Sequence, residues 1–279
     1  MTGDGAEIWL AKVIAKQAAA RTGPYSASWS TDPTLPSHVI YAPTNPPTTL
    51  KLPVLVWGQT GCTYNGRIFD AFLTEVASHG ILILSNGTPN GPGNPNGIAE
   101  TANPNTTLHR TAIDWVTKNA GTGKYAGVEV SRLAVAGQSC GGMQALFVSP
   151  DPRVTAIGIF NSGVINASDP LPSQTTKPIF YFLGGPTDIA YTNGERDYTF
   201  LPASTPKWKG NLPVGHGGTF SQANGGKFGV AASRWVQWLL RGNVTAAAYF
   251  TGTGPGSATG DGWATVSQSL DGIKVTSLD

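Results

Sequence analysis

Short apolar runs, rich in β-branched and aromatic residues, alternate with segments of helical periodicity through the centre of this 279-residue chain. The residue types and lengths of these runs predict strands over residues 38–42, 52–57, 81–84, 132–136, 154–160 and 178–183. Apolar positions at helical spacing predict helices over residues 67–78, 108–119, 140–148 and 228–240. Strands separated by helices pair in parallel and carry helices on both faces, so we expect an α/β fold built on a mostly parallel sheet.

The chain has no linker-like stretch and no internal repeat, and it is long enough for one substantial core, so we expect a single domain over residues 1–279. Residues 1–27 are predicted to form an N-terminal helical segment that contains an amphipathic helix over Ala6–Ala20. Charged residues interrupt the apolar positions of that helix, so the stretch lacks the continuous apolar region of a signal peptide. Residues 243–279 form a glycine-rich C-terminal extension.

Charged side chains make up 12% of the residues, and the formal net charge is +2. This balance excludes the strongly basic surface of a nucleic-acid-binding protein and the acidic run of a solvating tail. No apolar segment approaches the roughly 18 residues that a membrane-spanning helix needs. We therefore expect a monomer without a cofactor, whose partner is a substrate rather than a nucleic acid or a membrane.

A serine lies at the tip of one predicted strand, between two glycines. Gly137-Gln-Ser-Cys-Gly141 follows the strand over residues 132–136 and opens the helix over residues 140–148. This G-x-S-x-G pattern is typical of a nucleophile elbow, in which a tight turn excludes flanking side chains and exposes the serine hydroxyl. The helix N-terminus favours negative charge that develops beside it. Ser139 is therefore the candidate nucleophile, and the alternative is a glycine-rich turn without chemistry.

A serine nucleophile needs a base, and the expected chain order is serine, acid, histidine. The chain has four histidines, and only His216 follows Ser139. It lies in a glycine-rich loop just before the last long helix, where a solvated loop histidine is the alternative interpretation. Asp188 is the first acidic residue after the strand over residues 178–183. It is the candidate acid, which would orient the imidazole and stabilise its protonated form.

Other titratable residues compete with these candidates. Glu195 and Asp197 are alternative acids, although a salt-bridged turn around Arg196 would account for both of them equally well. We assign no catalytic role to His79, which is expected to end a helix, or to His109, which is expected to lie on a helix face.

The oxyanion that forms when a serine attacks a carbonyl group needs two backbone N–H donors. One donor belongs to the residue after the serine, which is Cys140. The other comes from a loop after an earlier strand, and Gly58-Gln-Thr-Gly-Cys62 follows the strand over residues 52–57. Gln59 is the first candidate for this second donor and Thr60 is the next. The alternative is an ordinary turn, with the donor supplied elsewhere.

Four ordered stretches give the chain a resemblance to α/β-hydrolases of the bacterial cutinase and polyester-hydrolase type, and to the wider dienelactone-hydrolase-like group. They are Trp57–Gly61, Val76–Ile83, Ala112–Val116 with Arg132–Gly142, and Pro178–Ala190 with Gly215-His216. The resemblance implies an α/β-hydrolase fold without a large lid domain. It also implies a serine carboxylesterase with Ser139, Asp188 and His216 as its triad and with backbone donors at Gln59 and Cys140.

The chain departs from that group at two positions beside the implied active site. Polyester-active members commonly have an aromatic residue in place of Gln59, where it also contacts substrate, and a methionine in place of Cys140. These differences bear on polymer cleavage more than on ester chemistry.

The chain has two cysteines, Cys62 and Cys140, and the implied fold puts both beside the oxyanion-binding loops. Two loops that face one oxyanion can bring their Cα atoms within the range of about 4.4–6.8 Å that a disulfide needs. We therefore predict a Cys62–Cys140 disulfide that fixes the two N–H donors relative to each other. The alternative is two buried thiols that pack as small apolar groups. Two cysteines are too few for a structural zinc site, so no metal is expected.

A disulfide would indicate an oxidising compartment, and a secreted protein is the expectation that follows, with a cytoplasmic location as the alternative. Four N-x-S/T sequons, at Asn86, Asn105, Asn166 and Asn243, point weakly in the same direction.

The expected reaction is hydrolysis of neutral, apolar or aromatic esters through an acyl-enzyme on Ser139. Thr60, Tyr64, Tyr191 and Trp208 are the candidate substrate contacts, although aromatic residues in such segments often pack in the core instead. The same triad also suits an acyltransferase or a lactone-forming or lactone-opening enzyme, and a peptidase or amidase. A ligand-binding homologue without turnover is a hypothesis from a different class.

Overall fold

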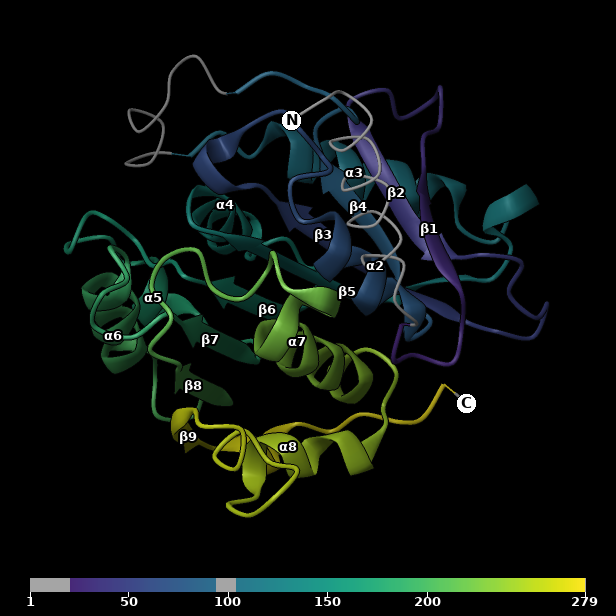
Figure 1. Ribbon diagram of the computed structural model, residues 1–279. Helices are drawn as coiled ribbons and strands as arrows, with labels where there is room; N and C mark the ends of the chain where they lie inside the picture. Colours follow the sequence, from purple (N-terminus) through teal and green to yellow (C-terminus); the bar gives the residue numbers. More distant parts are fainter. Residues whose placement is uncertain (1–20, 94–103, 279) are drawn as a thin grey trace, which may run out of the picture.

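The computed structural model describes residues 21–93 and 104–278, so the amphipathic helix predicted over Ala6–Ala20 lies outside the described residues. Within these ranges the strands form one nine-stranded sheet in the order β1-β2-β4-β3-β5-β6-β7-β8-β9 (Figure 1). The strand bounds are β1 Ala27–Ser30, β2 His38–Pro43, β3 Leu52–Gly58, β4 Leu82–Asn86, β5 Val128–Gln138, β6 Val154–Phe160, β7 Ile179–Leu183, β8 Lys207–Asn211 and β9 Ala264–Gln268.

The centre of the sheet is parallel and its edges are antiparallel. Strands β4, β3, β5, β6, β7 and β8 pair in parallel, whereas β1 and β2 at one edge and β9 at the other run antiparallel to their neighbours. The predicted α/β class with a mostly parallel sheet is therefore confirmed. Parallel strands end at one edge of the sheet, and that edge is where loops from different strands meet.

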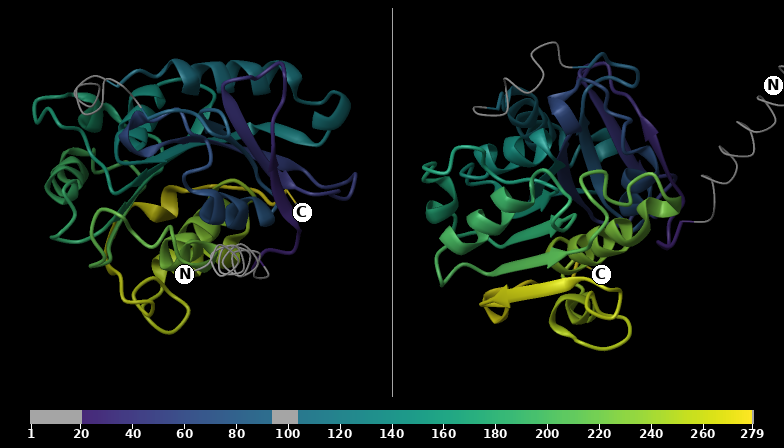
Figure 2. Two further views of the ribbon diagram at one scale, coloured as in Figure 1. Left: turned by 45° about the horizontal axis from the view of Figure 1, so that its top comes forward. Right: turned by 60° about the vertical axis from the view of Figure 1, so that its left-hand side comes forward.

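Helices cover both faces of the sheet (Figures 1 and 2). Side chains of α2, α7 and α8 form one apolar cluster with the sheet, and side chains of α3, α4 and α6 form a second cluster on the other face. The helix bounds are α2 Asp70–Ser78, α3 Thr107–Asn119, α4 Cys140–Val148, α5 Leu171–Gln174, α6 Tyr191–Phe200, α7 Gly226–Leu239 and α8 Ala248–Thr251.

Alternation along β3 shows why the sheet needs two helical layers. Leu55 and Trp57 belong to the cluster under α2 and α7, whereas Val54 and Val56 belong to the cluster under α3 and α4. All four side chains are buried, as expected for a central parallel strand that is apolar on both faces. This double burial fixes the position of the β3 C-terminus and of the loop that follows it.

The C-terminal extension contributes to the fold. β9 pairs with β8 at the edge of the sheet, and Trp263 is buried against Phe228 with ring centroids 4.9 Å apart. The apolar pattern of the sequence predicts neither β8, which carries two lysines, nor β9. Their ammonium groups find partners inside the protein, since Lys209 Nζ lies 2.7 Å from Glu195 Oε2 and Lys207 Nζ donates to the Leu201 carbonyl at 2.9 Å.

The turn that was expected around Arg196 is part of α6, and the expected ion pair forms between Arg196 and Asp197 at 3.0 Å. Glu195 pairs with Lys209 instead. Within residues 21–93 and 104–278, no helix is both long and apolar enough to cross a membrane.

Candidate active site

Ser139 occupies a strained turn between β5 and α4. Its backbone lies in the positive-φ region (φ 55°, ψ −122°), a conformation that residues other than glycine rarely adopt. Two hydrogen bonds hold this conformation: the Ser139 N–H donates to the Phe160 carbonyl at 2.9 Å, and the Ser139 carbonyl accepts from the Gly142 N–H at 2.9 Å. The predicted strand–serine–helix elbow is therefore present, with the hydroxyl at the carboxyl edge of the parallel strands.

The three side chains predicted to act together are joined by hydrogen bonds. His216 Nε2 lies 2.9 Å from Ser139 Oγ, and His216 Nδ1 lies 2.6 Å from Asp188 Oδ1. When Nδ1 carries the proton, it donates to Asp188 and leaves Nε2 free to accept the serine proton. The segments that supply these residues follow β5, β7 and β8. The sheet therefore brings His216 together with Ser139, 77 positions earlier in the chain, and with Asp188, 28 positions earlier.

Asp188 is held as a carboxylate by hydrogen bonds. Besides His216 at Oδ1, it accepts from the Ala190 N–H at Oδ1 (2.9 Å) and from the Gly184 N–H at Oδ2 (3.0 Å). The Asn161 amide also donates to Oδ2, at 2.8 Å. Burial alone would favour the neutral acid, but these hydrogen bonds, that from His216 first, outweigh burial and lower the Asp188 pKa below its usual value. Asp188 can therefore stabilise a protonated imidazole.

The loop that carries His216 packs directly against the end of β7. The Val214 and Gly215 N–H groups both donate to the Gly184 carbonyl, at 3.0 and 2.8 Å. A Cβ atom on Gly184 would lie 2.1 Å from the Gly215 carbonyl oxygen, so only glycine permits this approach. The acid and the histidine are thus attached to the sheet side by side.

The loop after β3 meets the start of α4 beside Ser139. A Cβ atom on Gly141 would lie 2.6 Å from the Gln59 backbone nitrogen, which puts the predicted oxyanion donor against the first turn of α4. Cys62 on this loop and Cys140 in α4 form a disulfide with Cα atoms 5.2 Å apart, so the predicted bond is confirmed. The two candidate N–H donors, Gln59 and Cys140, are therefore on segments joined covalently.

The candidate substrate contacts fall into two groups. Thr60, Tyr64 and Tyr191 are partly exposed, so they are accessible to a ligand. Trp208 is fully buried, and its ring packs 5.2 Å from that of Phe250, so the prediction that it contacts substrate is wrong. Successive side chains of a strand point to opposite faces of the sheet. With β8 paired to β7, the Trp208 side chain lies on a face that is covered by the core.

The remaining acids and histidines have other partners. Asp197, an alternative acid, is buried and accepts from the Val164 N–H at 2.6 Å. His79 follows the last residue of α2, and His109 is buried on α3, as predicted. His109 Nδ1 pairs with the Asn86 amide at 2.9 Å, so this sequon asparagine is part of a buried network.

Two buried amides beside the triad were missed by sequence reasoning. Gln138, which precedes the serine, donates to the carbonyl of His216 at 2.8 Å. Asn161, the first residue after β6, donates to Asp188 and to the carbonyl of Gly215. The only signal available in the sequence was position, because each residue comes at the end of a central strand.

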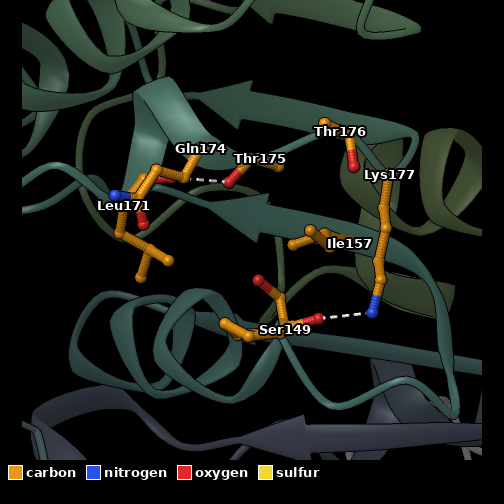
Figure 3. A pocket seen from close by; sticks show the side chains of 8 residues that line it. Ser149, Ile157, Leu171, Gln174, Thr175, Thr176 and Lys177 are labelled. Carbon is orange, nitrogen blue, oxygen red and sulfur yellow. Dashed lines mark hydrogen bonds between the residues drawn. The ribbon is translucent and has the colours of Figure 1, made fainter.

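A separate hollow of about 260 Å³ lies at the opposite ends of β6 and β7, next to α5 (Figure 3). Lys177 extends into it but donates to the Ser149 and Asp151 carbonyls, both at 2.6 Å, and Thr175 donates to the Leu171 carbonyl at 2.9 Å. Both side chains already donate to backbone carbonyl groups, and the residues that line the hollow include neither a histidine nor an acid.

Comparison with known protein families and a search of curated proteins found no match.

Proposed function

We propose that this protein is a serine carboxylic-ester hydrolase with an α/β-hydrolase fold, acting through an acyl-enzyme on Ser139. The observation that carries the proposal is the unbroken hydrogen-bonded chain from Ser139 Oγ through His216 to the buried Asp188. The strained elbow conformation of Ser139 adds independent support, because a backbone strain of this kind is typically kept at functional sites. The resemblance to cutinase-type and dienelactone-hydrolase-like enzymes agrees with this assignment.

The first half of the reaction transfers the acyl group to the enzyme. Ser139 Oγ forms a bond to the ester carbonyl carbon while its proton passes to His216 Nε2. The oxyanion that results faces the N–H groups of Gln59 and Cys140. Collapse of this intermediate breaks the bond to the alkoxy oxygen, which leaves as an alcohol with the proton from His216.

The second half releases the acid. Water gives a proton to His216 Nε2 and its oxygen attacks the acyl carbon, and collapse then breaks the bond to Ser139 Oγ as the proton returns to that oxygen. Asp188 stays ionised throughout and stabilises the imidazolium formed in each half. The products are one carboxylic acid and one alcohol, and the enzyme is regenerated.

Neutral apolar esters are the proposed substrates because apolar side chains flank the triad. Ile189, next to Asp188, is 80% exposed, and Val214, two residues before His216, is 40% exposed. Exposed apolar side chains that lie next to triad residues in the sequence favour an acyl or alcohol group without charge. The disulfide fits a secreted enzyme, and we propose that location.

Hydrolysis of p-nitrophenyl acetate and butyrate tests the proposal. Wild-type protein is expected to turn over both esters, and Ser139→Ala is expected to lose about 10⁵- to 10⁶-fold in kcat. Equal rates in the two proteins would contradict the assignment. Ser173→Ala is the matched control, because Ser173 is an exposed serine on α5, outside the triad.

A further inference from the structure

The loop that presents His216 has little intrinsic rigidity. Gly215 (φ 74°) and Gly218 (φ 53°) both adopt positive φ, and Gly217 lies between them. Glycine loses more conformational freedom on ordering than any other residue. A loop of this composition holds an imidazole in one place only if its backbone is held by other parts of the protein.

Two buried side-chain amides hold that backbone at consecutive carbonyl groups. Asn161 Nδ2 donates to the Gly215 carbonyl at 3.2 Å, and Gln138 Nε2 donates to the His216 carbonyl at 2.8 Å. Asn161 is 0% exposed and Gln138 is 3% exposed. The two amides come from the ends of adjacent strands, β6 and β5, which pair in the interior of the sheet.

Asn161 connects the histidine loop to the acid as well. Its amide nitrogen also donates to Asp188 Oδ2 at 2.8 Å, so one NH₂ group serves both a carboxylate and a loop carbonyl. The reverse orientation of this amide would put its oxygen against the carboxylate. Asn161 adopts φ 46°, a conformation that asparagine tolerates better than most residues, and its own N–H donates to the Phe182 carbonyl at 2.8 Å.

The same strand end also contacts the serine. Ser162 Oγ donates to the Ser139 carbonyl at 2.6 Å. The segment after β6 therefore touches the nucleophile, the acid and the histidine loop through two successive side chains, whereas Gln138 reaches the histidine loop from the strand that carries the nucleophile.

We propose that Gln138 and Asn161 are positioning residues that act as an amide clamp, fixing the His216 loop so that Nε2 stays within reach of Ser139 Oγ. The inference rests on the proposed function, because it assigns the clamp to the same triad. The clamp acts on the geometry of His216 and touches no substrate. Its loss therefore lowers kcat and leaves KM almost unchanged.

The test compares Gln138→Met, Asn161→Gly and the double variant with wild type. Methionine keeps the length of Gln138 without an N–H donor, and glycine keeps the positive φ of residue 161 without the amide. Gln174→Met and Asn45→Gly are matched controls, since Gln174 is exposed on α5 and Asn45 is an exposed asparagine at φ 51°. Urea unfolding identifies the variants that are folded at the assay temperature. Where the Asn161 variants do not fold, the kcat of Gln138→Met alone tests the proposal.

The clamp predicts a fall in kcat of about 10-fold for each single variant and about 100-fold for the double variant, with KM within twofold of wild type. Both controls keep the wild-type kcat. A kcat within twofold of wild type in the folded variants would overturn the proposal, because a purely structural role would change the unfolding midpoint and leave kcat intact.

A second readout requires no substrate. The downfield proton NMR resonance of the His216 Nδ1–H that donates to Asp188 is assigned by its loss in His216→Ala. We expect this resonance to broaden or disappear through solvent exchange in the clamp variants and to stay sharp in the controls. A sharp resonance in the folded double variant contradicts the clamp, whether or not Ser139 turns over an ester, so failure of the clamp and failure of the esterase assignment are distinguished.

Discussion

A Cβ atom on Gly141 would lie 2.1 Å from the carbonyl carbon of Gly58, so the first turn of α4 touches the end of β3 backbone to backbone. This contact sets the separation between the Gln59 N–H and the nucleophile. The two proposed oxyanion donors can face one carbonyl oxygen only if residue 141 has no side chain.

Gly141→Ala is therefore expected to damage catalysis by separating the two loops. We predict a loss of about 10²-fold in kcat, the magnitude seen when one oxyanion donor is removed, and a destabilisation of about 1–3 kcal/mol from overpacking. Steady-state kinetics and urea unfolding measure the two effects. Gly254→Ala is the control, because a Cβ atom there meets nothing within 4 Å. A wild-type kcat in Gly141→Ala would refute the proposed geometry of the two oxyanion donors.

Removing the disulfide is expected to cost mainly stability. Cys62 and Cys140 are 78 positions apart, and loop-closure entropy for that length predicts a loss of about 4.5 kcal/mol in the free energy of unfolding. Cys62→Ala is the informative variant, since Cys140 follows the nucleophile directly. Urea unfolding of this variant should match that of wild type in dithiothreitol. Equal stability of variant and oxidised wild type would contradict the prediction.

Asp188→Asn tests whether Asp188, rather than Glu195, is the acid of the proposed triad. The asparagine keeps the shape of the side chain but cannot stabilise the imidazolium or hold the same tautomer, so we predict a fall in kcat of about 10³- to 10⁴-fold. Glu195→Gln is the matched control, because Glu195 pairs with Lys209 and is outside the triad. We expect that control to keep kcat within threefold. A larger loss in Glu195→Gln than in Asp188→Asn would reverse the assignment.

Stability is expected to fall on acidification because two histidines are buried as neutral groups. Burial lowers the pKa of His38 to about 4 and that of His109 to about 3, from 6.5. Below pH 6.5 the unfolded chain binds more protons than the folded protein, so stability present at neutral pH is lost as the pH falls toward these values. Each histidine contributes a slope of up to about 1.4 kcal/mol per pH unit.

One buried acid opposes this trend. Burial raises the pKa of Asp197 to about 6 from 3.8, so the folded protein binds the extra proton between these two values and gains stability there on acidification. Between pH 6 and pH 5 the two histidines and Asp197 together therefore give a net slope close to that of one histidine. Urea unfolding at pH 6 and pH 5 measures this slope, and His38→Gln should show the flatter dependence. The same dependence in wild type and His38→Gln would exclude His38 as a source.

Position in the sequence was sufficient to pick out the three residues of the proposed triad, although only two of them follow strands that their own composition reveals. Ser139 and Asp188 lie in turns soon after apolar runs, and the expected chain order left His216 as the one histidine downstream of the serine. The disulfide could be predicted once both cysteines were assigned to facing loops. These inferences needed the parallel sheet, which brings strand ends together at one edge, together with the expected order of serine, acid and histidine and the fold that the resemblance implies.

The sequence was not sufficient where side-chain direction or pairing depends on register. The lysines of β8 hide its strand character, so neither the strand nor the inward direction of Trp208 could be predicted. No sequence motif around Gln138 or Asn161 indicates that their side chains contact the histidine loop. Their contacts with the histidine loop exist because β5 and β6 end side by side next to it, a relationship that only the folded chain contains.

Covalent labelling shows directly whether Ser139 is a nucleophile activated by His216. A serine-directed phosphonate is incubated with wild type, Ser139→Ala and His216→Ala, and intact mass and peptide mapping locate the adduct. We predict one phosphonate per wild-type molecule on Ser139, none on Ser139→Ala, and labelling of His216→Ala slowed by about 10³-fold or more. No adduct on wild type, or an adduct on another residue, would contradict the claim that Ser139 is a nucleophile activated by His216.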